Sequence, residues 1–416
     1  MKKTSFFLNA AATAVFAFAM GTCFQSCAVE DNPSPEPQPE PEPAPLVVDG
    51  EDLQDAIDRA FANGDEVVKL PAGVKLTMNQ PIEWGLDMII LGDTDAPAVI
   101  TMAEGAKFVI GGSFDLENVV FDASATDAPF IEMKALPSPE EGAAGFVKLN
   151  EAGAYEVDII QLNNVGVAGL KRQFFSMNQQ KYLINQLMIR NSIIHVDGTN
   201  KKPVIDCSGS GSGLFANVEI NMSTIFAIPA IEYNGGLFST QSGSTASAVG
   251  AEELNFVITS STLYNVPFGK TTCTLRENNK NYQYYKVNNN IIVNCGKKNE
   301  FLVGLAAGRV SNKANWTASD NVINWMTDEG TIDIGADEAT KIGLETSPTI
   351  EGIANFANPA LGDFSNGLGV GDPRWFSIGD VPGASAELVR EDAKLIYVVD
   401  KIVEKAISLD MNVEVK

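Results

Sequence analysis

The chain has 416 residues, of which 45% are hydrophobic and 20% charged, with 36 glycines and 20 prolines. This composition excludes a wholly disordered chain and a collagen-like one. The 53 acidic and 29 basic residues give a formal charge of -24, which argues against a nucleic-acid-binding protein. One histidine and five cysteines exclude a histidine-rich metal centre and a disulfide-dense scaffold.

The first 26 residues have the features of an export signal rather than of a folded segment. Two lysines precede an apolar run over residues 6–20, which is too short to span a membrane. A small residue, Ser26, then stands directly before Cys27. This order resembles a bacterial lipoprotein signal peptide at 1–26, which implies that Cys27 is lipidated and becomes the mature N-terminus. An ordinary secretory signal cleaved near Ser26 is the alternative.

Residues 27–45 predict an extended linker behind this anchor. Residues 31–45 read DNPSPEPQPEPEPAP, with proline at every second position from Pro33. Such a sequence favours polyproline II at about 3.1 Å per residue, which gives a stalk of roughly 45 Å. The acidic pair Glu30-Asp31 after Cys27 resembles the export tag of Bacteroidota surface lipoproteins. That resemblance implies an outer-membrane protein, exposed at the cell surface and attached to the membrane by its lipid alone.

The folded part begins with a predicted amphipathic helix at about 51–62. The stretch DGEDLQDAIDRAFANG at 49–64 has apolar residues at helical spacing, acidic residues in the first turn and a glycine at its end. The sequence VVKLPAG and a series of short apolar runs follow directly. This succession resembles the N-terminal cap of pectate-lyase-like right-handed parallel β-helices.

A repeated pattern supports the same fold. A small polar residue followed by a strand-like apolar pair recurs at Asn118, Asn164, Ser192, Ser223, Ser261, Asn290 and Asn321. Most steps are close to 30 residues, which suits one coil of a parallel β-helix, and the longer steps allow insertions. We therefore expect an all-β protein, a right-handed parallel β-helix over 46–376, in which this polar column has a structural role. The single histidine, His195, is expected to be packed or on the surface rather than catalytic.

Three stretches in the second half carry a sharper resemblance. They are KVNNNIIVNCGKKNEF at 286–301, TASDNVINW at 317–325 and the run at 347–375 that ends in GDPRW. They resemble β-helix lipoproteins from the polysaccharide-utilisation systems of Bacteroidota, families largely defined as domains of unknown function. Residues 377–416 lie beyond that resemblance. Their apolar residues between 388 and 406 lie close to helical spacing, so we expect a C-terminal helix that caps the last coil. Two final strands are the alternative.

The charge is unevenly distributed along the chain. Residues 163–313 contain 14 basic and 8 acidic residues, a net charge of +6, between two acidic ends. Basic residues recur at similar distances after the repeat markers, which predicts a row along one edge of the β-helix. Arg276 and three tyrosines are expected in an insertion beside that row. The resulting candidate glycan-binding set is Lys171, Arg172, Lys201, Lys202, Lys270, Arg276, Tyr282, Tyr284, Tyr285, Lys297 and Lys298.

A cationic row beside aromatic rings suits a polyanionic polymer such as a uronate-rich or sulfated glycan. The simpler interpretation is that lysines are common in solvated turns. Three functions stay open. The first is a non-catalytic, surface-exposed lipoprotein that binds such a polysaccharide. The second is a β-helix polysaccharide lyase, which needs a base and a cation, often calcium, at the uronate carboxylate. The third is a structural or adhesive surface protein.

The sequence identifies no catalytic residue and no resident metal, and it predicts no cofactor other than calcium in the lyase case. The paired aspartates and the Gly-His-Gly motif of polygalacturonase-type hydrolases are missing, and His195 stands in the sequence HVDG. Other glycan-utilisation proteins stay open as partners.

Overall fold

A computed structural model of the protein describes residues 47–136, 147–177, 181–197, 202–207, 213–228, 237–240, 248–251, 254–266, 273–274, 282–295, 316–335, 353–356, 359 and 364. All described residues belong to one compact unit, Leu46–Lys416. This described part is mostly β-strand, and its strands pair largely in parallel. The all-β fold class predicted from the sequence is therefore confirmed.

The predicted N-terminal helix is present as α1 (Leu53–Ala62). Asp52 caps its start, because the side chain accepts a hydrogen bond of 2.9 Å from the backbone N–H of Gln54. The helix stops before Gly64, which has a φ of 80° that glycine adopts without strain. The apolar face of α1 is buried, and the helix contacts the first two strands, β1 and β2.

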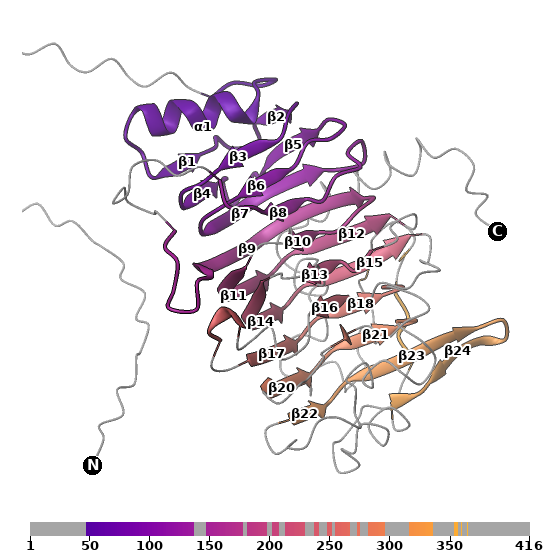
Figure 1. Ribbon diagram of the computed structural model, residues 1–416. Coiled ribbons are helices and arrows are strands. Elements are labelled where there is room, and N and C mark those ends of the chain that lie inside the picture. The colour runs from indigo at the N-terminus through magenta and orange to yellow at the C-terminus, as the bar shows by residue number, and fades with distance from the viewer. Residues whose placement is uncertain are drawn as a thin grey trace, which may run out of the picture. The chain divides into compact units, whose positions relative to one another are not determined.

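The strands of the described part form two sheets (Figure 1). The larger sheet contains β1 (Val67–Lys69), β2 (Lys75–Met78), β4 (Met88–Leu91), β5 (Ala98–Met102), β7 (Phe114–Asp122), β9 (Tyr155–Leu170), β11 (Tyr182–Arg190), β12 (Ile193–Asp197), β14 (Leu214–Asn221), β15 (Thr224–Ile228), β17 (Leu254–Thr259), β18 (Thr262–Tyr264), β20 (Tyr282–Asn288), β21 (Ile291–Val293), β22 (Trp316–Ser319), β23 (Val322–Thr327) and β24 (Gly330–Asp333). The smaller sheet contains β3 (Ile82–Trp84), β6 (Phe108–Ile110), β8 (Ile131–Met133), β10 (Phe175–Met177), β13 (Ile205–Cys207), β16 (Phe238–Thr240) and β19 (Cys273–Thr274).

Each strand pairs with its counterpart one repeat later in the chain. In the smaller sheet, β10 pairs in parallel with β13, so that Phe175 lies opposite Ile205. In the larger sheet, β11 pairs with β14 and β12 with β15 in the same way. The last hairpin differs, because β23 and β24 pair antiparallel. Figure 1 shows the strands succeeding one another from α1 to this hairpin.

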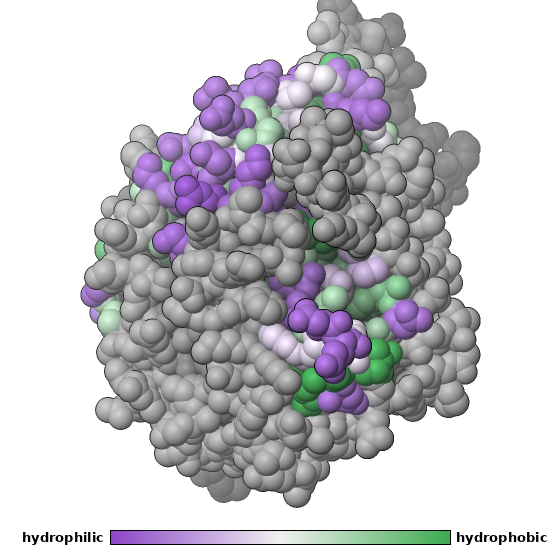
Figure 2. Space-filling model, turned by 90° about the vertical axis from the view of Figure 1, so that its right-hand side faces the viewer, coloured by the Kyte–Doolittle hydropathy of each residue, from purple (hydrophilic) through white to green (hydrophobic). Residues whose placement is uncertain are grey.

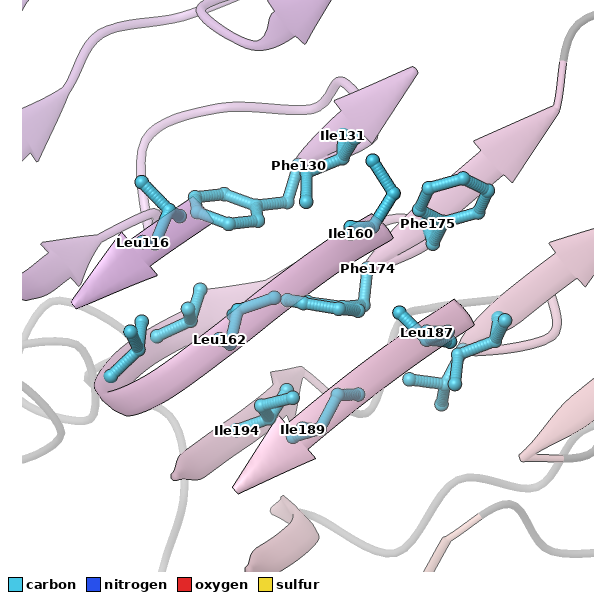
Figure 3. Packing of buried hydrophobic residues seen from close by; sticks show 14 of the residues in the cluster. Leu116, Phe130, Ile131, Ile160, Leu162, Phe174, Phe175, Leu187, Ile189 and Ile194 are labelled. Carbon is cyan, nitrogen blue, oxygen red and sulfur yellow. The ribbon is translucent and has the colours of Figure 1, made fainter. Parts of the chain in front are cut away.

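The hydrophobic core lies between the two sheets. Strand residues alternate, so one set of apolar side chains points inward from every repeat. Phe130 and Phe174, from neighbouring repeats, stack with ring centroids 5.5 Å apart, and Figure 3 shows them among the aliphatic side chains of the same core. Cys207 and Cys295 are buried free thiols, and burial raises the pKa of Cys295 to about 12.

A left-handed turn position recurs between the two halves of the larger sheet. Its residues have φ between 47° and 60° and are Asn118, Asn164, Asn191, Met222, Ser260, Asn289 and Asp320. Asparagine adopts this conformation more easily than most residues, because its short side chain hydrogen-bonds locally. The Asn164 side chain instead bonds to the neighbouring repeat, donating from Nδ2 to the Oδ1 of Asn118 at 2.8 Å.

The residue after each of the last five turn positions is polar and buried, and these residues form a ladder. They are Ser192, Ser223, Ser261, Asn290 and Asn321. The backbone N–H of each donates to the side-chain oxygen of the next, over distances of 3.2, 3.2, 2.9 and 3.0 Å along the ladder. The structural role predicted for this column is therefore confirmed. Asn118 and Asn164 occupy the turn position itself, one residue earlier than the other markers.

Replacing Asn290 by alanine is expected to lower the free energy of unfolding by about 3 kcal/mol. The Asn290 side chain accepts from the Ser261 N–H and donates to the Ile258 carbonyl and to Asn321, so truncation removes the partners of several buried polar groups. Urea denaturation would measure the change. The control is Asn255→Ala on the half-buried outer face of β17, which should cost less than about 1 kcal/mol. Equal losses for the two variants would contradict the role of the ladder.

Candidate functional site

Three of the predicted basic residues lie in two adjacent turns that lead into the smaller sheet. Lys171 and Arg172 follow β9, and Arg172 is exposed and donates from Nε to the Asp127 carbonyl at 3.1 Å. Lys202 is exposed in the turn before β13. Phe175 pairs with Ile205, and Arg172 and Lys202 each stand three residues before this pair. The two side chains therefore start from equivalent positions of neighbouring turns.

Six other predicted residues cannot be placed. Lys201, Lys270, Arg276, Lys297, Lys298 and the lipidation residue Cys27 lie outside the described residues. Lys270 does stand three residues before Cys273, the first residue of β19, which is the same sequence position that Arg172 and Lys202 have before β10 and β13.

The expected position of the tyrosines beside the basic row is wrong. Tyr282, Tyr284 and Tyr285 lie within β20, a strand of the larger sheet, and not in an insertion next to the turns. Tyr284 is in register with Asn255, and Tyr285 is in register with the core residue Phe256. The reason is the strand preference of aromatic residues combined with parallel pairing on β17.

The outer face of the larger sheet carries polar residues that the sequence analysis missed. Arg190 of β11 and Glu219 of the paired strand β14 form a bidentate ion pair with two hydrogen bonds of 2.9 Å. Beside them, Asn255 donates to the Oδ1 of Asn217 at 2.6 Å, and Asn217 donates to the Asn185 carbonyl at 2.7 Å. Strand alternation would have identified each as outward-facing. Only the register shows which of them are neighbours.

A pair of carboxyl groups lies on the same outer face at β7. Asp115 and Glu117 point to one side of the strand, and Gln161 of β9 donates to both, at 3.2–3.3 Å from Asp115 and 3.3 Å from Glu117. Burial, followed by the charge of Glu117, raises the pKa of Asp115 to about 6. A carboxyl group with this pKa exchanges a proton near neutral pH, as a general acid or base must.

Cation binding is not evident in these clusters. Within the described ranges, no group of three or more His, Cys, Asp and Glu side chains is arranged to hold a metal ion. Figure 2 shows hydrophilic residues gathered at the top of the molecule, the end at which α1 lies in Figure 1, and a mixed group of hydrophilic and hydrophobic residues lower down.

His195 is buried on the outer side of β12. Its Nδ1 accepts a hydrogen bond of 3.1 Å from the Gly169 N–H, which assigns the proton of the neutral ring to Nε2. The ring stacks on Phe226 with centroids 4.9 Å apart, and Nε2 is buried without a hydrogen bond. Burial lowers the pKa of His195 to about 4, against the smaller opposing effects of the Asp197 charge and of the Ile228 backbone. His195 is therefore packed and does not face solvent, which is one of the two placements expected from the sequence.

Comparisons with protein-family models, with curated proteins and with solved structures give no match to this chain. Among the helices of the described residues, none is long and apolar enough to cross a membrane.

His195→Asn is expected to remove a loss of stability at acidic pH. The folded pKa of about 4 lies below the ordinary value of 6.5, so the unfolded chain binds the proton first. Above pH 6.5 the ring is neutral in both states and does not oppose folding. As the pH drops to 4, the free energy of unfolding falls by up to about 3 kcal/mol. Asparagine can accept from Gly169 without titrating. The measurement is the difference in unfolding free energy between variant and parent from pH 7 to 4, and a constant difference would contradict it.

Asp115→Asn is expected to stabilise the protein at neutral pH. The pKa of Asp115 is about 6 in the folded protein and 3.8 ordinarily, so the folded state binds the proton more tightly. The contribution of this group to the free energy of unfolding is therefore full below pH 3.8 and is lost as the pH rises to 6. Because Asp115 is partly exposed, we expect a gain of about 1 to 2 kcal/mol at pH 7.5 and little change at pH 4. Thermal unfolding at both pH values would test this. The control is Asp158→Asn, an exposed carboxyl of β9, and a similar gain there would indicate a general effect of net charge.

The two groups act in opposite directions over the same pH range. Between about pH 4 and 6, rising pH favours folding through His195 and disfavours it through Asp115. The parent protein can therefore show a flat profile, which is why each test compares a variant with the parent at every pH.

Proposed function

We propose that this chain is a surface-exposed outer-membrane lipoprotein that binds an anionic polysaccharide on a right-handed parallel β-helix. The anchor at Cys27 and the linker at 27–45 rest on the sequence features described above. The β-helix is supported by the repeated parallel pairings and by the recurring left-handed turn. Its coils would each contribute one strand to the smaller sheet and two to the larger.

The observation that carries the binding proposal is the equivalent placement of Arg172 and Lys202. Both are exposed, and both stand three residues before strands that pair with each other. Paired parallel strands lie about 4.8 Å apart, so the positions repeat at a spacing that a polymer chain with regularly placed carboxylates or sulfates can follow. Residues 163–313 also have a net charge of +6. Binding of this kind depends on exposed charges and should weaken as salt rises.

A polysaccharide lyase is the second candidate, because the raised pKa of Asp115 gives the outer face a proton-exchanging group near neutral pH. A lyase must take a proton from the carbon next to the uronate carboxylate and expel the glycosidic oxygen on the neighbouring carbon. Calcium would supply the cation that holds the substrate carboxylate. A structural or adhesive role is the third candidate, and it predicts no retention by any polysaccharide.

The charge-reversal variant Arg172→Glu/Lys202→Glu is expected to lose most of its affinity for a polyanionic glycan, at least tenfold at low salt. Native affinity electrophoresis through gels containing acidic or neutral polysaccharides would measure the loss. The matched control is Lys69→Glu/Lys75→Glu, which makes the same change in net charge at exposed positions of β1 and β2. If both variants lost affinity for the glycan equally, net charge would be the cause, and this result would contradict a specific binding site at Arg172 and Lys202.

The same gels separate the three functions when they are also stained for polysaccharide, with and without calcium. Retardation of the parent with intact polysaccharide supports a binding protein. A cleared zone at the protein band indicates an enzyme, and its loss in Asp115→Asn would assign that carboxyl to the reaction. Migration without retardation in every gel would favour the structural or adhesive role.

A further inference from the structure

Strand β9 contains one extra residue opposite the single histidine of the chain. The register of β9 and β12 shifts between Ile194 and Val196, so that Ala168 and Gly169 of β9 stand against His195 alone. Such a β-bulge leaves the backbone groups of one residue outside the regular ladder of hydrogen bonds. A buried N–H in this position needs an acceptor from elsewhere.

The side chain of His195 supplies that acceptor. Its Nδ1 accepts a hydrogen bond of 3.1 Å from the Gly169 N–H, and the contact is buried. Glycine is required at position 169, because φ is 79° and a Cβ atom would lie 2.8 Å from the Cα of Ser124. The backbone at Gly169 is therefore packed against the preceding repeat and hydrogen-bonded to the following one.

The bulge determines where the basic turn after β9 begins. Strict alternation from the core residue Val167 would turn Leu170 outward, and the extra residue returns Leu170 to the core. Lys171 and Arg172 come next, and the core residue Phe174 follows them. The two cationic side chains thus stand on a short turn between two core residues, and the bulge fixes the position of the first.

Gln173 connects the other end of this turn to both neighbouring repeats. Its carbonyl accepts from the Phe130 N–H at 3.0 Å, and its Nε2 donates to the Oδ2 of Asp206 at 3.3 Å. Asp206 lies in β13, shortly after Lys202, so this contact also ties the turn of Arg172 to that of Lys202. At the start of the turn, the histidine bond has the corresponding role.

We propose that His195 is a positioning residue for the basic turn, whose imidazole holds the bulge at Gly169 and so fixes where Lys171 and Arg172 meet a polyanionic glycan. This role rests on the proposed function, because it concerns the geometry of that binding surface. The ring itself does not touch the glycan, since it is only 3% exposed and stacks on Phe226.

A role in packing alone makes the opposite prediction for two substitutions. Phenylalanine keeps a ring that can stack on Phe226 but has no acceptor. Asparagine loses the ring but keeps an acceptor oxygen on the same side-chain atom, Cγ, that carries Nδ1 in histidine. If His195 only filled space, His195→Phe would be the milder change. Positioning through the Gly169 bond requires His195→Asn to be the milder one.

Native affinity electrophoresis of the full chain through gels containing dextran sulfate would compare the two variants. We expect His195→Phe to bind this polyanion several-fold more weakly than the parent, and His195→Asn to recover most of the affinity. The matched control is Phe256→Leu, a buried ring of the β17 core, which lowers stability away from this turn and should keep the affinity of the parent. The reverse order of the two histidine variants, or an equal loss in the control, would overturn the proposal.

The same gels distinguish failure of this role from failure of the proposed function. A parent protein that is not retarded would contradict glycan binding, and the role of His195 would fall with it. A retarded parent together with an equally retarded His195→Phe variant would overturn the positioning role alone.

A measurement on the parent protein tests the hydrogen bond directly. Because the chain has a single histidine, labelling histidine with ¹⁵N gives the signals of one ring. At neutral pH the spectrum is expected to show the proton on Nε2 and an unprotonated Nδ1. A proton on Nδ1 would remove the acceptor for Gly169 and overturn the proposal, whether or not the variants fold.

Discussion

The left-handed turn between the two halves of the larger sheet is the constraint on which the remaining structure depends. A residue at positive φ reverses the side-chain alternation at one point, and the polar ladder behind it ties the N–H of one repeat to the side chain of the next. A slip of one residue would turn every core side chain to the outside. The buried hydrogen bonds of Asn290 and Asn321 penalise such a slip, because they can form only in this register.

The elements predictable from the sequence are those fixed by local patterns. Helix α1 follows from apolar spacing and its Asp52 cap, and the turns follow from the recurring asparagines and serines. The markers at Asn118 and Ser192 nevertheless differ by one position, because asparagine suits both the left-handed turn and the ladder, whereas serine on the ladder leaves the turn to Asn191. Met222 occupies the same turn conformation without a favourable propensity, so stacking between repeats outweighs local preference there.

The candidate site was less predictable, because neighbours in space depend on the length of every intervening turn. Gln161 bonds to Asp115 across 46 residues, whereas Arg190 bonds to Glu219 across 29. No single sequence separation identifies both of these pairs. The equivalent positions of Arg172 and Lys202 were approachable from the sequence because both precede a strand by the same distance. The tyrosines were misplaced because they were assigned to an insertion, whereas residues 282–288 form β20 in register with β17.

The outer surface of the larger sheet is therefore divided by the same turn into two faces with different chemistry. On β7, β9, β11 and β14, the outward residues before the turn include carboxylates, amides and an arginine, which bond to each other across the strands. After the turn, the outward residues include the apolar Val120, Ala168, Ile193 and Phe226 beside His195, and the ring of Phe364 packs on Phe226. A hydrophilic polymer would have to give up hydration to contact the apolar face, and that face is already buried. Under the proposed function, the polar face and the basic turns are therefore the surfaces left for a glycan, whereas Phe364 packs on Phe226 on the other face.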